Sequence, residues 1–335
     1  MTTMMKKSGF ITKHPAALRL PALILLFILI QQGSYLNRAF AYSPEKADFT
    51  VRFRNESCPY RIMGVYALPG EWIRLEAVDS KGGKQFLLTQ TGGRIIQSEN
   101  NCWQWQAPRQ PHLCSIRIRD TRNSDSISLN IFIMIPYTDL QGEYLGHYRI
   151  GKYPSKPLKN LPIYTPPRGF VEVTRENEKV LVSPHFHIGQ FTCKQDSGYP
   201  RYLVLNERLL LKLELILEAV NENGYPCNTL HIMSGYRTPY YNEAIGNVKY
   251  SRHIWGGAAD IFIDENPRDG MMDDLNHDGQ VNFQDAAVIS DIIDTMYGIP
   301  RYKPFVGGLG RYRKTEHHGP FVHVDVRGYR ARWEH

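Results

Sequence analysis

The chain has 335 residues, which suits a targeting segment and two domains better than one ordinary domain. Its formal net charge is +7, but residues 1–41 carry five basic side chains and no acidic one, so about +2 remains on the rest. The remaining charges are scattered along the chain, which argues against a nucleic-acid partner.

The N-terminal residues have the pattern of a secretory signal peptide. Basic residues precede a short apolar run, Leu20–Ile30, and Ala39-Phe40-Ala41 supplies a small-x-small cleavage site. Such a run is roughly half as long as a membrane-spanning helix needs. We therefore expect residues 1–41 to be a signal peptide, with an uncleaved anchor as the alternative. No cysteine for lipid attachment lies near Ala41, so we expect an exported, periplasmic protein without a stable membrane span after cleavage.

Five cysteines follow the signal segment, and they are Cys58, Cys102, Cys114, Cys193 and Cys227. An oxidising compartment permits disulfides, and an odd number leaves at least one thiol unpaired. Cys102 and Cys114 form the easiest pair by sequence separation, but the pairing stays open. None belongs to a C-x-x-C pair, so a cysteine metal site has little support.

The segment after the signal peptide alternates between apolar and polar side chains in short runs. Phe49–Phe53 and Ile127–Ile133 are two such runs, and glycine-containing turns separate the runs from one another. This period-two pattern, with no long amphipathic helix, predicts an all-β sandwich domain over residues 46–150. We expect Trp103 and Trp105 in or beside its core, and we find no catalytic constellation in it.

A proline-rich segment, residues 151–168, follows and predicts a semi-rigid linker. Beyond it, residues 169–335 have the pattern of an α+β domain. Asn206 can cap a helix over Glu207–Asn223, where leucines recur at helical spacing until Gly224 stops it. We expect short strands at Thr229–Met233, Ala258–Ile263 and Phe321–Arg327.

Two of these strands carry metal-ligand residue types. His253 precedes Asp260 by seven residues, with small side chains between them that permit a tight turn onto a strand. In Phe321–Arg327, strict alternation sends three valines to the core and His323, Asp325 and Arg327 to one polar face. Two imidazoles and one carboxylate suit a catalytic zinc, which keeps a fourth position for water. We therefore predict a zinc site at His253, Asp260 and His323.

Three separated motifs in this half resemble the zinc D-alanyl-D-alanine carboxypeptidase family. They are Ser234-Gly235-Tyr236-Arg237-Thr238-Pro239 with Asn242, the Ser251–Asp260 segment, and Phe321–Asp325. The glycines of Gly307-Gly308-Leu309-Gly310, with Arg332-Trp333, resemble the murein endopeptidase branch. This family shares its metal geometry with hedgehog domains, so the resemblance implies a hedgehog/DD-peptidase fold with a small antiparallel sheet and flanking helices.

The resemblance also implies a site for D-amino-acid stem peptides of peptidoglycan. Its motif residues Ser234, Tyr236, Asn242 and Ser251 are the expected substrate-binding residues. Arg237 follows a tight turn after a strand, where its guanidinium can stabilise an oxyanion or grip a substrate carboxylate. The alternative role for Arg237 is an ion pair that holds the loop.

The general base is harder to assign. Many members of the family have an acidic residue three positions before the last ligand, and this chain has Pro320 there. Asp325, on the same strand face as His323, is our first candidate base, and orienting a ligand imidazole is its alternative role. His318 and Glu316, on the preceding loop, are the second candidates.

Between the two halves of the zinc site lies a twelve-residue EF-hand-like loop, Asp274–Asp285. Gly279 stands at its sixth position, where the chain must bend. The oxygen-bearing residues at the ligand positions predict a structural Ca²⁺ site, and they are Asp274, Asn276, Asp278, Gln280, Asn282 and Asp285. A helix over Phe283–Met296 is expected to follow.

Together these features predict a zinc metallopeptidase that hydrolyses D-amino-acid-containing peptide bonds in peptidoglycan, as a carboxypeptidase or an endopeptidase. The endopeptidase is slightly favoured by the branch resemblance. The alternative is a hedgehog-like, non-catalytic module that binds zinc and calcium and recognises cell wall or protein partners.

Overall fold

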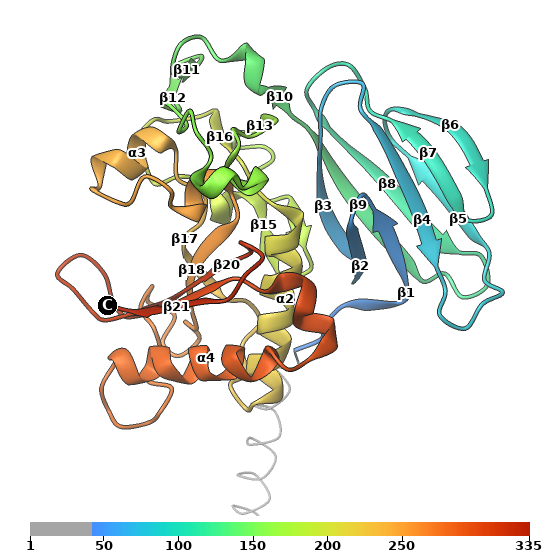
Figure 1. The fold of residues 1–335 in the computed structure, drawn as a ribbon. Coiled ribbons are helices and arrows are strands. Elements are labelled where there is room, and N and C mark those ends of the chain that lie inside the picture. Colours follow the sequence, from blue (N-terminus) through green and yellow to red (C-terminus); the bar gives the residue numbers. More distant parts are fainter. Residues whose placement is uncertain (1–41) are drawn as a thin grey trace, which may run out of the picture. The chain divides into compact units, whose positions relative to one another are not determined.

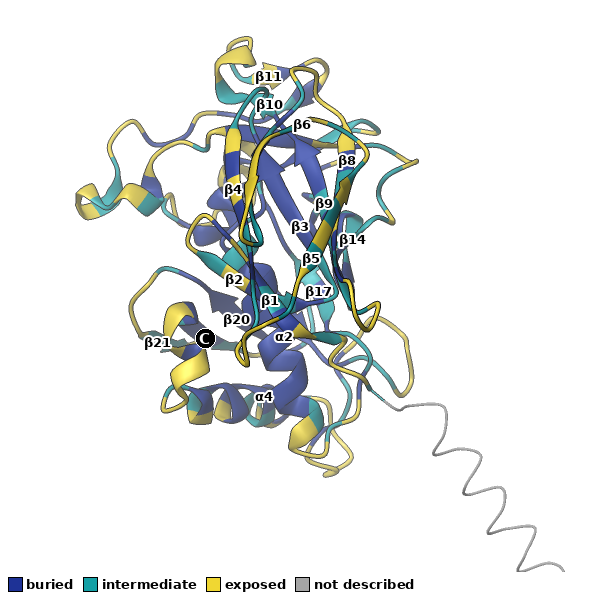
Figure 2. Ribbon diagram, turned by 90° about the vertical axis from the view of Figure 1, so that its right-hand side faces the viewer, coloured by how far each residue is buried: buried dark blue, intermediate teal, exposed yellow. Residues whose placement is uncertain are grey.

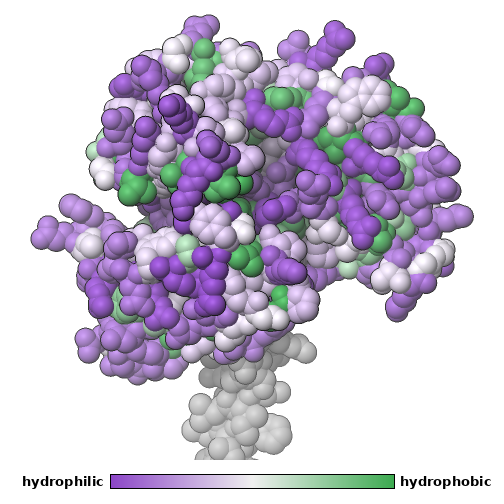
Figure 3. Space-filling model, viewed as in Figure 1, coloured by the Kyte–Doolittle hydropathy of each residue, from purple (hydrophilic) through white to green (hydrophobic). Residues whose placement is uncertain are grey.

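The computed structural model describes residues 42–335 (Figure 1). The expected signal peptide, residues 1–41, lies outside the described residues. None of the helices between Tyr42 and His335 combines the length and apolarity that crossing a membrane requires. Figure 3 shows a largely hydrophilic face on which apolar side chains gather only in small groups.

Nine strands occupy residues 46–133. They are β1 (Lys46–Phe53), β2 (Glu56–Tyr60), β3 (Ile62–Ala67), β4 (Trp72–Val78), β5 (Phe86–Gln90), β6 (Arg94–Glu99), β7 (Cys102–Gln106), β8 (Leu113–Asp120) and β9 (Ser126–Ile133). One sheet has the order β2-β1-β4-β7-β6 and the other β3-β9-β8-β5. The pairs are antiparallel except for β3 with β9.

The alternation expected in this segment is present in the structure. Along β8, every second side chain is buried, and both Trp103 and Trp105 belong to the core. That core continues into the C-terminal half, because one cluster of buried apolar residues spans both. The independence of residues 46–150 as a domain therefore stays a prediction.

Short elements connect the two halves of the chain. They are β10 (Ile135–Pro136), η1 (Tyr137–Asp139), β11 (Tyr144–Leu145), β12 (Tyr148–Arg149), η2 (Leu158–Asn160), η3 (Pro162–Tyr164), β13 (Gly169–Val173), β14 (Leu181–Ser183), β15 (Phe186–His187), η4 (Ile188–Phe191) and β16 (Arg201–Leu203). The proline-rich segment packs against the loop that carries His253: Tyr164 contacts Trp255, whose indole N–H donates to the Thr165 carbonyl at 2.8 Å.

The C-terminal half is a mixed α/β arrangement around a second five-stranded sheet (Figure 1). Its elements are α2 (Glu207–Glu222), β17 (His231–Ser234), α3 (Pro239–Ala244), η5 (Arg252–Trp255), β18 (Ala258–Phe262), α4 (Phe283–Met296), η6 (Pro300–Phe305), β19 (Gly308–Tyr312), β20 (Phe321–Asp325) and β21 (Ala331–Glu334). The sheet order is β17-β18-β20-β19-β21. We expected an antiparallel sheet; the edge strand β21 instead pairs in parallel with β19.

Both long helices form where the sequence predicts them. Asn206 caps α2 by accepting from the Arg208 N–H, and Gly224 ends the segment with a φ of 87°. Helix α2 is buried along most of its length (Figure 2). It also contacts the N-terminal strands, because Glu218 accepts from Tyr60 and Lys46, and Glu207 pairs with Arg54.

All five cysteines lie among the described residues, and all are free thiols. Four of them are buried, as free cysteines commonly are.

Candidate metal centre and active site

Two paired strands and one short helix bring the three predicted ligands together. Asp260 on β18 and His323 on β20 are direct partners in the antiparallel ladder. His253 comes from η5, just before β18. The tight turn between them needs Gly256, which has a φ of 62° and packs so closely on Val204 that an added Cβ would lie 2.1 Å from its carbonyl oxygen.

Three atoms of these residues converge. Nε2 of His253 lies 3.2 Å from both Oδ1 of Asp260 and Nδ1 of His323, and that Nδ1 lies 2.8 Å from Oδ1. A tetrahedral zinc with bonds of about 2.0–2.1 Å has its ligand atoms about 3.3 Å apart, so the spacing is close to that of a zinc site. Among residues 42–335, this is the one group of three His, Cys, Asp or Glu side chains found to converge in this way.

Hydrogen bonds on the outer side fix both imidazole tautomers. Nδ1 of His253 lies 2.6 Å from the Gly235 carbonyl oxygen, which can only accept, so this nitrogen carries the proton. Nε2 of His323 lies 3.3 Å from a carboxylate oxygen of Asp325 and donates likewise. The two inward nitrogens therefore present lone pairs beside the Asp260 carboxylate. Three inward acceptors without a proton fit a cation, and the donor set suits zinc.

The surroundings hold two of the three residues, His253 and Asp260, in their metal-binding forms. For His323, burial alone would lower the pKa, but hydrogen bonds to Asp260 and Asp325 raise it. Burial, followed by repulsion from Arg237, lowers the pKa of His253 to about 4, so its imidazole is neutral at neutral pH. Burial alone would raise the pKa of Asp260, but His253, His323 and Arg237 bring it well below its usual value. Asp260 is thus held as a carboxylate, which a metal ligand requires.

Asp325 lies behind His323 and has no exposure to solvent. Besides His323, its oxygens accept from the Gly308 N–H at 2.8 Å and from Nε of Arg327 at 2.8 Å. Gly308 has to be glycine here, since an added Cβ would meet Asp325 Oδ2 at 2.4 Å. The geometry favours the orienting role and gives no support to Asp325 as the general base, because its oxygens are already used and inaccessible.

Arg237 lies on the other side of the metal centre. Its guanidinium pairs with Oδ2 of Asp260, and its Nε donates to Ser234 Oγ at 2.9 Å. Arg237 can fill both of the roles considered for it. The ion pair fixes the side chain, and its remaining N–H groups stay available for a substrate oxygen.

A cleft surrounds the metal centre. One cavity of about 620 Å³ contains all three ligands, and its wall includes Tyr250, Trp333 and Ser251. Arg237 also lines a second cavity of about 320 Å³. Asn247 connects the first cavity with a third one, of about 620 Å³, beside α3. Two further cavities therefore adjoin the one that contains the three converging residues.

His318 lines the second cavity together with Arg237, so the preceding loop borders the cavity that adjoins the metal centre. Its Nδ1 lies 2.8 Å from the Gly319 carbonyl oxygen and carries a proton, which leaves Nε2 free to accept one. Glu316 is exposed and is not part of the wall of this cavity.

The expected substrate-binding residues take different places. Ser234 lines the second cavity and Ser251 the first. Tyr236 is buried, with its hydroxyl 3.0 Å from that of Tyr153, so it packs inside the protein instead of facing the cleft. Asn242 is buried as well, lines the third cavity and donates to the Val248 carbonyl at 3.0 Å.

Several residues of the cleft have no place in it that the sequence alone predicts. Tyr250, Tyr312 and Trp333 line the first cavity, and the Trp333 indole donates to the Tyr312 hydroxyl at 2.9 Å. Lys194 and His231 line the second cavity. The Arg332-Trp333 pair was noticed as a resemblance, but no local pattern shows that its strand, β21, returns beside the metal ligands.

The predicted calcium loop has the expected bend, with Gly279 at a φ of 83°. Asp274 accepts from the Gly279 N–H at 2.8 Å, and Asp278 accepts from the Gln280 N–H at 2.8 Å. Asp285 is fully buried and accepts from the backbone N–H groups of Leu275 and Asn282. In this structure Asp285 closes the loop and caps α4, and the carboxylates do not converge as a metal-binding group does.

Comparison with known proteins identifies the C-terminal half. Residues 184–290 match the model of the peptidase M15 family, whose members are zinc D-Ala-D-Ala carboxypeptidase-like peptidases. The match contains His253 and Asp260, while the third ligand, His323, is supplied by the fold. No curated protein and no solved structure matches the chain. The mixed α/β fold and the converging His-Asp-His group agree with this match, which supports a metallopeptidase of the peptidase M15 type in the C-terminal half.

Proposed function

We propose that this protein is an exported zinc peptidase that hydrolyses D-amino-acid-containing peptide bonds in the stem peptides of peptidoglycan. The observation that carries the proposal is the convergence of His253, Asp260 and His323 at the base of a cleft that Arg237 also lines. The signal-like N-terminus supports export, and the motif resemblance supports cell wall as the substrate.

Zinc held by the three ligands would supply a Lewis acid for the scissile carbonyl and a water whose pKa is lowered to about 7. Residues of the protein stabilise the developing charge and transfer the proton. Arg237, already fixed by Ser234 and Asp260, directs its free N–H groups at the carbonyl oxygen as negative charge develops there. His318 accepts a proton on Nε2 and returns it to the leaving amine.

The shape of the cleft favours an endopeptidase. Shared wall residues link the metal cavity to a further cavity at Arg237 and to another at Asn247. The adjoining cavities give room for more of a substrate chain than one residue beyond the scissile bond, as cleavage of a cross-link requires. A carboxypeptidase needs room for only one residue beyond the bond.

Digestion of purified cell wall tests this proposal. Protein loaded with zinc should release stem-peptide fragments, and a chelator should abolish the release. His323→Ala should lose bound zinc and activity together. The matched control is His112→Ala, which changes an exposed histidine of the N-terminal half and should retain both. Zinc-loaded wild-type protein that binds cell wall but releases no fragment would instead support the non-catalytic alternative.

A further inference from the structure

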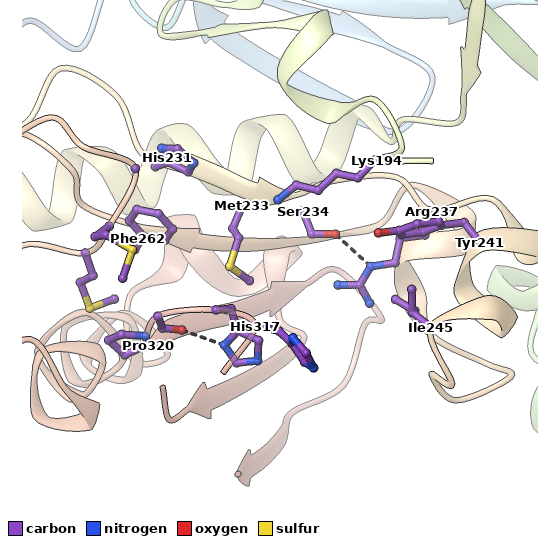
Figure 4. Close-up of a pocket in the computed structure, with 15 residues that line it drawn as sticks. Lys194, His231, Met233, Ser234, Arg237, Tyr241, Ile245, Phe262, His317 and Pro320 are labelled. Carbon is purple, nitrogen blue, oxygen red and sulfur yellow. Dashed lines mark hydrogen bonds between the residues drawn. The ribbon is translucent and has the colours of Figure 1, made fainter. Parts of the chain in front are cut away.

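The second cavity, next to the metal centre, is lined by basic side chains (Figure 4). Its cationic and imidazole residues are Lys194, Arg237, His231, His317 and His318, and the rest of its wall is apolar or uncharged. No aspartate or glutamate is part of this wall. Such a wall attracts an anion, since partly enclosed walls of one charge sign focus the electrostatic field.

Among the cationic side chains of this cavity, Lys194 is the one without an ion-pair partner in the described residues. It follows η4 and the buried Cys193, and none of the ion pairs found among residues 42–335 includes it. Figure 4 shows its ammonium end extending toward Ser234, on the same side of the cavity as the Arg237 guanidinium. Although Lys194 as a residue is exposed, desolvation of its ammonium group, followed by repulsion from Arg237, lowers its pKa.

The other charged groups here have partners outside the cavity wall. Arg237 pairs with Asp260, whose remaining oxygen faces the metal centre. His231 lies 3.2 Å from Asp264. An anion that enters between Lys194 and Arg237 would therefore meet two cations, of which only Arg237 has a carboxylate partner.

We propose that this cavity is the subsite for the leaving residue and that Lys194 and Arg237 bind its free α-carboxylate there. This inference rests on the proposed peptidase function. The cavity, of about 320 Å³, has room for the residue that carries this carboxylate. His318, which the proposed function makes the proton carrier for the leaving amine, lines the same cavity, and we therefore assign the leaving residue to this side.

The chemistry of the reaction fits such a subsite. The oxygen of water bonds to the scissile carbonyl carbon, the C–N bond breaks, and a proton from the water goes to the departing nitrogen. A residue that ends a stem, or that joins two stems through its D-amino group, carries a free carboxylate one carbon away from that nitrogen. A residue inside an ordinary peptide has an amide there, so Lys194 would select D,D-bonds at stem ends and in cross-links over interior bonds.

A pair of peptides that differ only in this carboxylate tests the inference. One is a stem-peptide mimic ending in D-Ala-D-Ala as the free acid, and the other is its C-terminal amide. We expect wild-type zinc protein to prefer the acid by about 10- to 100-fold in kcat/KM, the size of a charge-assisted hydrogen bond. In Lys194→Met the acid-to-amide ratio should fall toward one, while Lys194→Arg should keep most of the preference.

Lys179→Met, which removes an exposed lysine that lines none of these cavities, is the matched control and should leave the ratio unchanged. Equal hydrolysis of the two peptides by wild type, or an unchanged ratio in Lys194→Met, overturns the inference alone. Hydrolysis of neither peptide by protein that carries its zinc overturns the proposed function and this inference with it.

Discussion

Asp260 and His323 stand directly opposite each other on β18 and β20, with Oδ1 of one 2.8 Å from Nδ1 of the other. The antiparallel register therefore places two of the three predicted metal ligands, and a short turn places the third, His253. Three predictions concern residues near this pair, and a fourth concerns the loop Asp274–Asp285.

The first prediction concerns Asp325, which holds His323 from behind. In Asp325→Asn, the charge partner of Arg327 is lost inside the protein, and we expect zinc affinity to fall by about 10- to 100-fold together with turnover. Zinc content after dialysis against a weak chelator, measured with kcat, checks this. Full zinc occupancy with strongly reduced turnover would instead restore Asp325 as a candidate base.

The second prediction concerns His318 as the proton carrier. His318→Gln should retain one zinc per protein and lose about 10²- to 10⁴-fold in kcat, since it removes a proton acceptor without touching a ligand. Metal analysis and steady-state kinetics on the same sample are the measurement. Glu316→Gln is the matched change on the same loop and should behave as wild type; the reverse result for the two variants would move the role to Glu316.

The third prediction concerns Lys212, which lies fully buried on α2 and donates to the Asp325 carbonyl at 2.7 Å. Burial lowers the pKa of Lys212 to about 7. Between pH 7 and its unfolded value of about 10.4, the unfolded chain binds more protons at this site than the folded one, so the contribution of Lys212 to the free energy of unfolding rises with pH.

Lys212→Met should remove this contribution while filling a similar volume. We expect the free energy of unfolding of the wild type to rise relative to that of the variant between pH 7 and 9, by at most about 1.4 kcal/mol for each pH unit. Urea titrations of both proteins at several pH values give the difference. Parallel pH profiles for the two proteins would show that Lys212 keeps its charge in the folded state.

The fourth prediction concerns the loop Asp274–Asp285, for which calcium remains a prediction. Calorimetric titration of metal-stripped protein should show one Ca²⁺ per chain, and calcium at 100 times its Kd should add about 2.7 kcal/mol to the free energy of unfolding. Asp278→Ala should abolish the binding, whereas Asp269→Ala, in the neighbouring exposed loop, should not. Absence of calcium binding would leave Asp285 with the loop-closing role that the structure shows.

Local patterns predicted the long helices and the three residues that converge as a possible metal site. Asn206 and Gly224 mark the ends of α2, which the sequence predicts because capping is a local interaction. The alternation in Phe321–Asp325 is local as well, and it predicts which side of the strand carries His323. The burial of Asp325 escaped prediction, since it depends on Gly308 from another strand. Tyr236 was assigned to the substrate from its place in a motif, but the side chain points to Tyr153. Lys194 escaped notice because only the fold brings it beside Arg237.

Helix α2 makes the N-terminal strands part of the same folding unit as the metal centre. Glu218 and Glu207 have partners on β1, β2 and the turn between them, while Lys212 on the same helix supports the strand that ends at Asp325. A fragment that began at Gly169 would uncover one side of this helix and leave both glutamates without those partners. A shorter catalytic version of the protein is therefore better obtained by shortening exposed loops between the N-terminal strands than by removing those strands.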